Sequence, residues 1–163
     1  MSRLDHASLV PCDSVKGEDP EDEALLQDMV ADARSYITSF PWCRDVEECY
    51  VADLSVGGVV AVVLVRISPS REDVDEWLWL VVGDLPPAYL VTDDAPNPAA
   101  ALRAYVDEMG RWVEAVRTGE STAELIPVET ASGDGEIEPT LDHAADLDSR
   151  LQFLQREFLK GHS

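Results

Sequence analysis

Two β-branched runs flank a pair of glycines in Cys49-Tyr-Val-Ala-Asp-Leu-Ser-Val-Gly57-Gly58-Val-Val-Ala-Val-Val-Leu-Val-Arg66-Ile67. Adjacent glycines suit a two-residue primed turn, because both central residues of that turn need a positive φ. The stretch therefore predicts a β-hairpin whose loop is the glycine pair. In that register Tyr50 faces Val65, and the side of the sheet that they share is apolar apart from the tyrosine hydroxyl.

The other side of the predicted hairpin mixes polar and apolar side chains. The same register places Asp53 opposite Val62 and Val51 opposite Leu64, with Val60 nearer the loop. Because this side is only partly apolar, we expect something to shield it. We therefore predict that Asp53, Val60, Val62 and Leu64 bind a partner, and a homodimer through this second sheet face is a further expectation.

The remaining elements follow from apolar patterns and helix start signals. Residues pointing to both faces are apolar in the stretch Trp77-Leu-Trp-Leu-Val-Val82, which indicates a strand buried on both faces. Two prolines separate it from a short strand at Tyr89-Leu-Val91. Three amphipathic stretches follow capping residues and predict helices. Their caps and first residues are Asp19 with Pro20, Asn97 with Pro98, and Thr140.

The order of these elements predicts an α+β fold. We expect an antiparallel meander of three to four strands packed with an N-terminal helix and two C-terminal helices. Residues 1–18 lack periodicity and are expected to be a flexible leader. Residues 19–160 are expected to form a single domain with an acidic loop at 120–139.

Composition restricts the kind of partner. The 163 residues include 12 Lys and Arg against 33 Asp and Glu, for a net charge of −21. Such a charge excludes direct nucleic-acid binding and anionic lipid, and it favours a basic protein partner or a saline environment. Three cysteines without a signal peptide predict reduced thiols and a cytoplasmic location. No apolar run approaches the ~18 residues that span a bilayer.

Residues 120–148 contain nine carboxylates and no Lys or Arg. One interpretation is a solvated acidic loop, and the other is a docking surface for a basic partner. Under the second interpretation, the partner-binding residues are Glu129, Asp134, Glu136 and Glu138. Their spacing differs from that of a calcium-binding loop, so no metal site is expected here.

The sequence contains no recognisable catalytic set. It has no G-x-S-x-G, no H-E-x-x-H and no glycine-rich phosphate loop, so we predict neither catalytic residues nor a cofactor. Cys43 lies in an aromatic corner, Phe40-Pro-Trp-Cys43, that suits a packed plug. A reactive Cys43 is the alternative, with Arg44 as the local cation that would favour its thiolate. His143 is expected to be a surface residue of the last helix.

Several motifs together resemble a widespread family of small bacterial proteins that is itself uncharacterised. The similarity extends over about residues 25–158 and implies a bacterial origin without implying an activity. The motifs are Phe40-Pro-Trp-Cys43, Gly57-Gly-Val-Val-Ala-Val-Val-Leu-Val-Arg-Ile67, Asp75-Glu-Trp-Leu-Trp-Leu-Val-Val-Gly-Asp-Leu-Pro-Pro-Ala-Tyr89, Asp93-Asp-Ala-Pro-Asn-Pro98 and Leu125-Ile-Pro-Val128.

A helix followed by a meander and a Pro-Pro segment also resembles the order of elements in the ubiquitin-conjugating (E2-like) fold. That family places a nucleophilic cysteine between the meander and the next helix, whereas residues 84–102 contain none. We therefore expect the chain to lack the thioester chemistry of that family, even if it shares the fold. A shared fold does not by itself imply a shared function.

These observations predict a non-catalytic, acidic protein-binding module. The first expectation is an immunity or antitoxin-type protein that neutralises a basic toxin or effector by direct binding. The alternatives are a secretion chaperone or adaptor, and an E2-like enzyme or carrier that uses Cys43.

Overall fold

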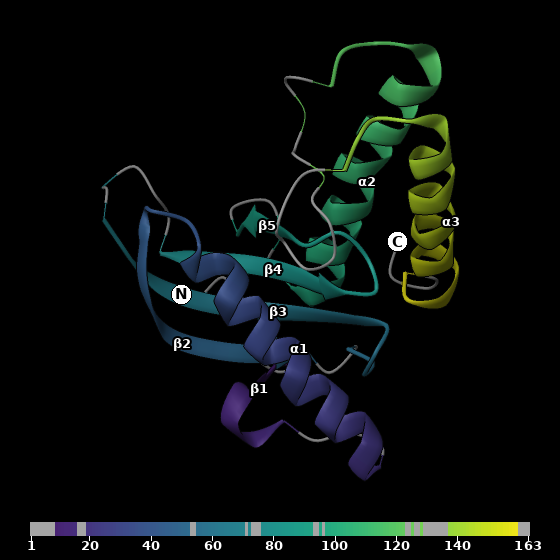
Figure 1. Cartoon of the computed structure of the whole chain (residues 1–163). Coiled ribbons are helices and arrows are strands. Elements are labelled where there is room, and N and C mark those ends of the chain that lie inside the picture. Colours follow the sequence, from purple (N-terminus) through teal and green to yellow (C-terminus); the bar gives the residue numbers. More distant parts are fainter. Residues whose placement is uncertain are drawn as a thin grey trace.

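The computed structural model of the chain describes residues 9–15, 19–52, 55–70, 72, 76–92, 95, 97–122, 125, 128 and 137–159 (Figure 1). Its elements are β1 (Leu9–Pro11), η1 (Cys12–Ser14), α1 (Pro20–Thr38), β2 (Cys43–Ala52), β3 (Val60–Pro69), β4 (Trp77–Gly83), β5 (Ala88–Val91), α2 (Pro98–Thr118) and α3 (Leu141–Glu157). The strands form one sheet in the order β1-β2-β3-β4-β5, and all neighbours are antiparallel. The predicted α+β class is confirmed, with one strand more than the three to four expected.

The three helices begin at the predicted caps. The Asp19 side chain accepts a hydrogen bond from the Asp22 N–H at 2.8 Å, and the Asn97 side chain accepts one from the Ala100 N–H at 2.8 Å. Thr140 caps α3 in the same way. Capping side chains satisfy backbone N–H groups that the first helical turn leaves without partners, so these start signals act locally.

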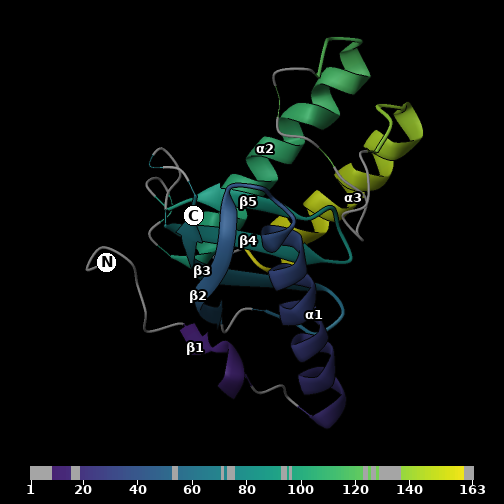
Figure 2. The same cartoon turned by 60° about the vertical axis from the view of Figure 1, so that its left-hand side comes forward.

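The sheet has a helical layer on each face. Val60, Val62 and Leu64 of β3 pack with α2 and α3, whereas Ala61 and Val63 pack with α1. Figure 2 shows the same layers from another side, with α2 and α3 extending beyond the sheet. The predicted burial of β4 on both faces is confirmed, since its five central residues are all buried. Among the described helices, none is long and apolar enough to cross a membrane.

The hairpin between β2 and β3 is present, but its predicted register is wrong by one residue. Tyr50 pairs with Leu64 instead of Val65. Val56 and Val60 exchange hydrogen bonds of 2.8 and 3.2 Å, so the loop has three residues, with Gly58 at φ 78°. Because side chains alternate along a strand, this shift moves Tyr50 to the side of α2 and brings Val51 to the side of α1.

The expectation of a flexible leader at residues 1–18 is wrong for its described part. Leu9–Pro11 pairs with β2 as the edge strand β1, and Leu9 lies opposite Ala52. Cys12 forms a disulfide with Cys49, with the two Cα atoms 5.5 Å apart. The prediction of three reduced thiols is therefore also wrong, and Cys43 is the free cysteine among the described residues.

Candidate functional site

The described surface is hollowed where the β2–β3 hairpin loop meets α3. A cavity of about 340 Å³ opens there, and we call it the hairpin-tip cavity. This volume lies in the range of ligand pockets, roughly 300–1,000 Å³. The lining residues come from the hairpin loop, the β4–β5 loop and α3: Gly58, Val59, Asp84, Leu85, Ser149, Arg150, Phe153 and Leu154.

The first wall is the hairpin loop, which is tied to α1. The Gly57 N–H donates to Asp22 Oδ1 at 2.8 Å, and Asp22 lies in the first turn of α1. Leu25 also contacts this loop, because its Cδ1 lies 3.5 Å from the point that a Cβ on Gly58 would occupy. The exposed Leu25 side chain of α1 therefore lies next to the hairpin loop.

The second wall is the β4–β5 loop, which is held against the hairpin. The Asp84 N–H donates to the Val59 carbonyl at 3.0 Å. Gly83 precedes it with φ 141°, and a Cβ there would lie 2.4 Å from the same carbonyl oxygen. A side chain at position 83 would force the two loops apart, so glycine is required where they meet. Leu85 then turns inward and is buried.

The third wall is one face of α3. Leu154 is almost fully buried and closes the inner end of the cavity, whereas Phe153 is 37% exposed at its mouth. The Phe153 ring packs against Phe158 with ring centroids 6.0 Å apart, and the Arg156 guanidinium lies 5.9 Å from the Phe153 ring centroid. Val59, Leu85, Phe153 and Leu154 together make the cavity mainly apolar.

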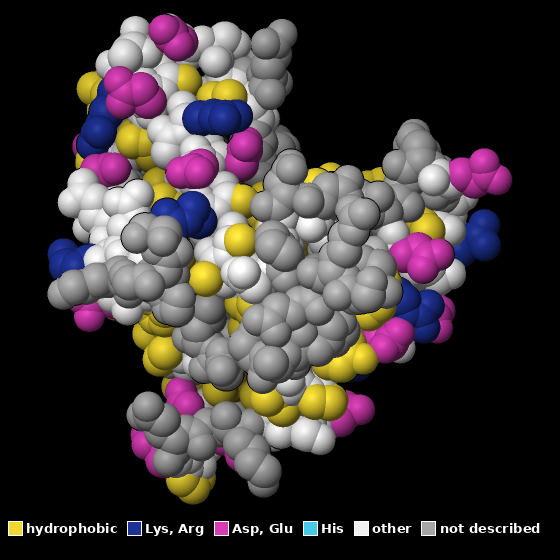
Figure 3. Space-filling model, turned by 180° about the vertical axis from the view of Figure 1, so that it is seen from behind, with side chains coloured by type: hydrophobic (Ala, Val, Ile, Leu, Met, Phe, Trp, Pro, Cys, Tyr) yellow, Lys and Arg dark blue, Asp and Glu magenta, His cyan; other side chains and the backbone are white. Residues whose placement is uncertain are grey.

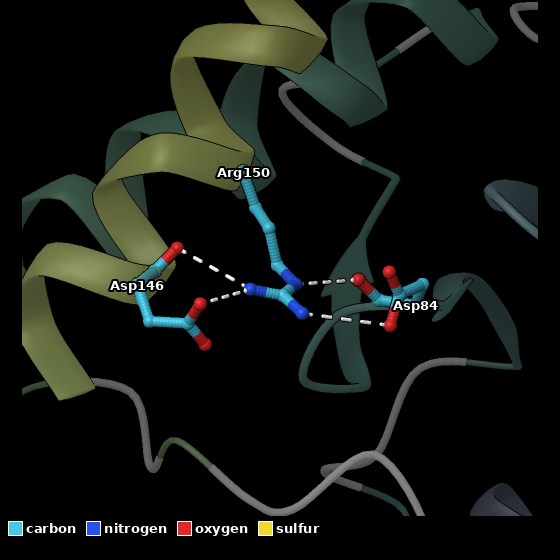
Figure 4. Close-up of polar contacts among 3 residues, drawn as sticks. All are labelled: Asp84, Asp146 and Arg150. Carbon is cyan, nitrogen blue, oxygen red and sulfur yellow. Dashed lines mark hydrogen bonds and ion pairs between the residues drawn. The ribbon is translucent and has the colours of Figure 1, made fainter.

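Arg150 joins the second and third walls (Figure 4). Its Nε donates to the Asp84 carbonyl at 2.9 Å, and its Nη1 donates to Asp146 Oδ1 at 2.5 Å. Its Nη2 lies 3.6 Å from Asp84 Oδ1. Burial lowers the pKa of Arg150, but the hydrogen bonds and charges of Asp146 and Asp84 raise it, and the net pKa is raised. The guanidinium is thus permanently charged and already paired.

The rim of the cavity is acidic overall. The side chains of Asp84 and Asp146 are 73% and 67% exposed, and Arg150 is the single guanidinium between them. Two accessible carboxylates against one paired cation leave one net negative charge beside an apolar hollow, because Glu157 balances Arg156 at the mouth at 3.2 Å. This arrangement suits an apolar group that has a positive charge next to it.

The structure places the predicted partner-binding residues in three different situations. Val60, Val62 and Leu64 are fully buried, so predicting them as a partner surface is wrong. The α2 and α3 helices cover that face of the sheet, which also leaves no room there for the expected homodimer contact. Glu138 is exposed just before α3. Asp53, Glu129, Asp134 and Glu136 lie outside the described residues.

Cys43 is poorly placed for nucleophilic chemistry. It is buried, and burial together with the charge of Asp45 raises the pKa of its thiol. Its Sγ lies 3.8 Å from the Asp45 carbonyl oxygen. The neighbouring Phe40 and Trp42 rings stack at 4.9 Å, which confirms the packed aromatic corner. A raised pKa reduces the thiolate fraction at neutral pH, the opposite of what a reactive cysteine needs.

The cavity residues were not predicted as a site from the sequence. From the sequence, Asp84 and Leu85 belong to the segment that ends the strand at 77–82, and the core stripe expected for the last helix is Leu147, Leu151, Leu154 and Phe158. Two signals are present: Phe153 falls outside that stripe, and Arg150 is the first Lys or Arg after Arg117.

No family model, curated protein or solved structure matches this chain. The resemblances to a bacterial family and to the E2-like fold stay predictions. The geometry of the cavity and the charge of the chain are therefore the features from which a function is inferred.

Proposed function

We propose that this protein is a non-catalytic binding protein that neutralises a basic protein partner by direct contact, as immunity proteins and antitoxins do. The observation that supports this best is the combination of a net charge of −21 with an apolar cavity rimmed by exposed Asp84 and Asp146. Long-range negative charge speeds the approach of a cationic partner, and a desolvated apolar contact slows its departure.

Negative charge also extends beyond the cavity rim. Residues 19–39, which include α1, contain six Asp and Glu and one basic residue, Arg34. The carboxylates in the first turn stabilise the helix N-terminus. Asp28 and Asp32 are exposed further along, where no capping role applies. On the face opposite to Figure 1, hydrophobic side chains reach the surface in several places, with carboxylates and Lys or Arg side chains interspersed around them (Figure 3).

The alternatives are less well supported. An E2-like enzyme or carrier would need Cys43 as its nucleophile, and that thiol is buried with a raised pKa. A secretion chaperone or adaptor would use the same charge complementarity. It differs in outcome, because a chaperone delivers an active partner whereas an immunity-type protein blocks it.

The proposed location is the cytoplasm, and the Cys12–Cys49 disulfide is the observation that counts against it, so this pair allows a direct test. Thiols in intact cells are trapped with an alkylating reagent and the protein is analysed by mass spectrometry. Alkylation of both Cys12 and Cys49 supports the cytoplasm, where disulfides are rare. An intact disulfide in the trapped protein contradicts that location.

The binding proposal is tested by selecting peptides from a random display library against the immobilised full chain. We expect the enriched peptides to have a net positive charge and at least one large apolar residue. The same selection against a chain with acidic residues neutralised on α1 and at the cavity rim should lose that charge bias. Enrichment of neutral or acidic peptides by the parent chain would contradict a basic partner.

A further inference from the structure

We infer that the hairpin-tip cavity receives one apolar side chain from an extended basic segment of the partner, with a neighbouring Lys or Arg paired to Asp84 and Asp146. This inference rests on the proposed function, because it specifies where and how a basic partner is held.

The shape of the cavity suits a single large side chain. Leu85 and Leu154 are buried at its inner end, and Val59 and Phe153 line it nearer the surface. Phe153 is one of five large hydrophobic residues that are exposed within the described part of the chain, and Leu25 beside the hairpin loop is another. Exposed apolar side chains that gather around a hollow often mark a contact surface.

The charges select a cation as the neighbour of that side chain. Arg150 is engaged by the Asp84 carbonyl and by the Asp146 carboxylate, so an incoming anion gains little from it. An incoming cation meets two exposed carboxylates that lie on either side of Arg150. At the Phe153 side of the mouth Arg156 is paired with Glu157 at 3.2 Å, so that side offers no net negative charge to a cation. The basic residue of the occupant therefore sits at the end of the cavity near Asp84.

A second copy of this chain is a poor occupant. Two molecules of net charge −21 repel each other at every approach. A segment rich in Lys and Arg is attracted by the same field and can place its aliphatic neighbour in the cavity. The charge of the whole molecule and the composition of the cavity thus favour the same class of ligand.

The test uses three capped, fluorescein-labelled peptides and the full chain. The parent peptide is Gly-Lys-Arg-Leu-Lys-Gly, the second has serine in place of leucine, and the third has glutamine in place of each basic residue. Fluorescence anisotropy at low ionic strength measures each affinity. We expect the parent to bind at least tenfold more tightly than either altered peptide.

Variants of the chain then locate the binding. Phe153→Ser and the pair Asp84→Asn with Asp146→Asn should each weaken the parent peptide about fivefold or more. The matched controls are Leu141→Ser, which removes another exposed apolar residue of α3, and the pair Asp107→Asn with Glu114→Gln on the exposed face of α2. Both controls should bind as the parent chain does, and thermal melting checks that every variant is folded.

The outcomes separate this inference from the proposed function. If the parent peptide binds but Phe153→Ser and the double Asn variant bind equally well, the cavity is not the site, while a basic partner still fits. If the glutamine peptide binds as tightly as the parent, the cavity takes apolar groups without charge selection and the basic partner is wrong. If none of the peptides binds, this inference is wrong.

Discussion

Trp79 is the largest side chain that the sheet buries completely. Its indole Nε1 donates to the Ala95 carbonyl at 2.7 Å, which ties the centre of β4 to the segment before α2. Trp77 is different, since it is only partly buried and stacks on Tyr50 with ring centroids 6.5 Å apart. The sequence predicts burial for the whole stretch from Trp77 to Val82, and within it the structure gives Trp79 the larger role.

Replacing Trp79 with alanine should lower the free energy of unfolding by about 3–5 kcal/mol, because a large cavity and an unpaired carbonyl are left behind. Trp77→Ala serves as the comparison and should cost distinctly less. Guanidinium unfolding followed by circular dichroism measures both. A Trp79→Ala protein that unfolds cooperatively at the parent's midpoint would contradict the central position of β4.

Tyr105 should make the stability of the protein sensitive to alkaline pH. Burial raises the pKa of its phenol far above the ordinary value of about 10, and its hydroxyl donates to the Pro86 carbonyl at 2.7 Å. Between the unfolded and folded pKa values the unfolded chain binds fewer protons, so stability falls as pH rises above about 10.

Tyr105→Phe isolates this effect. Near neutral pH the variant should be less stable by about 1 kcal/mol, the usual contribution of one hydrogen bond. Above pH ~10 the parent should lose its advantage, since phenylalanine does not titrate. Urea unfolding at a series of pH values measures the difference. A difference that stays constant through the alkaline range would show that Tyr105 ionises as freely in the folded protein as in the unfolded chain.

At the scale of elements, the disulfide fixes the short strand β1. Only three residue pairs join β1 to β2, and Cys12 follows directly after β1. A strand this short makes few backbone hydrogen bonds to its neighbour, so the disulfide between Cys12 and Cys49 keeps it in place. The cross-link also restricts the unfolded chain, because it closes a loop between residues 37 positions apart.

Reducing this bond should lower the free energy of unfolding by about 4 kcal/mol in the chain-entropy model for a loop of this size. Cys12→Ser should lose a similar amount, and Cys43→Ser, which leaves the disulfide intact, is the comparison for replacing a cysteine. Thermal melting with and without reductant measures the change, and mass spectrometry verifies the redox state. An unchanged melting temperature in fully reduced protein would show that β1 holds without the bond.

At the scale of the whole molecule, the main electrostatic feature is the net charge of −21. Exposed charges act on the rate at which a charged partner arrives, and salt screens them over roughly 8–10 Å at physiological ionic strength. Buried apolar contacts act mainly on the rate at which the partner leaves. The acidic segment, residues 120–139, should therefore affect mainly the association rate, and the hairpin-tip cavity mainly the dissociation rate.

Neutralising Glu129, Asp134, Glu136 and Glu138 together should slow association of the cationic peptide at low ionic strength and leave its dissociation rate nearly unchanged. High ionic strength should slow the parent chain to a similar rate. Stopped-flow fluorescence measures both rates. A chain with the same charge change at Asp28, Asp32, Asp107 and Glu114 shows whether the acidic segment matters more than net charge. If the first quadruple variant associates as fast as the parent, the segment is a solvated loop.

Much of the fold could be predicted because its signals are local. Capping side chains and first-turn prolines act within one helical turn, and an apolar run such as residues 77–82 indicates burial without reference to its neighbours. Asp19, Asn97 and Thr140 therefore marked the helix starts correctly, and the three central strands were placed in order. Net charge is additive along the chain, so the acidic character was equally certain.

The candidate site could not be predicted because it depends on contacts between distant segments. The pairing of Val56 with Val60 and that of Tyr50 with Leu64 do not belong to one continuous register, so the three-residue loop and an irregularity between Ala52 and Val56 together decide which face Tyr50 occupies. The burial of Val60 depends on where α2 and α3 dock, and the pairing of Cys12 with Cys49 depends on the sheet edge. The sequence by itself determined the elements and the charge of this protein. Only the tertiary structure decided the register, the disulfide and the cavity whose walls Arg150 joins, because each brings together residues that exert no influence on one another until the chain is folded.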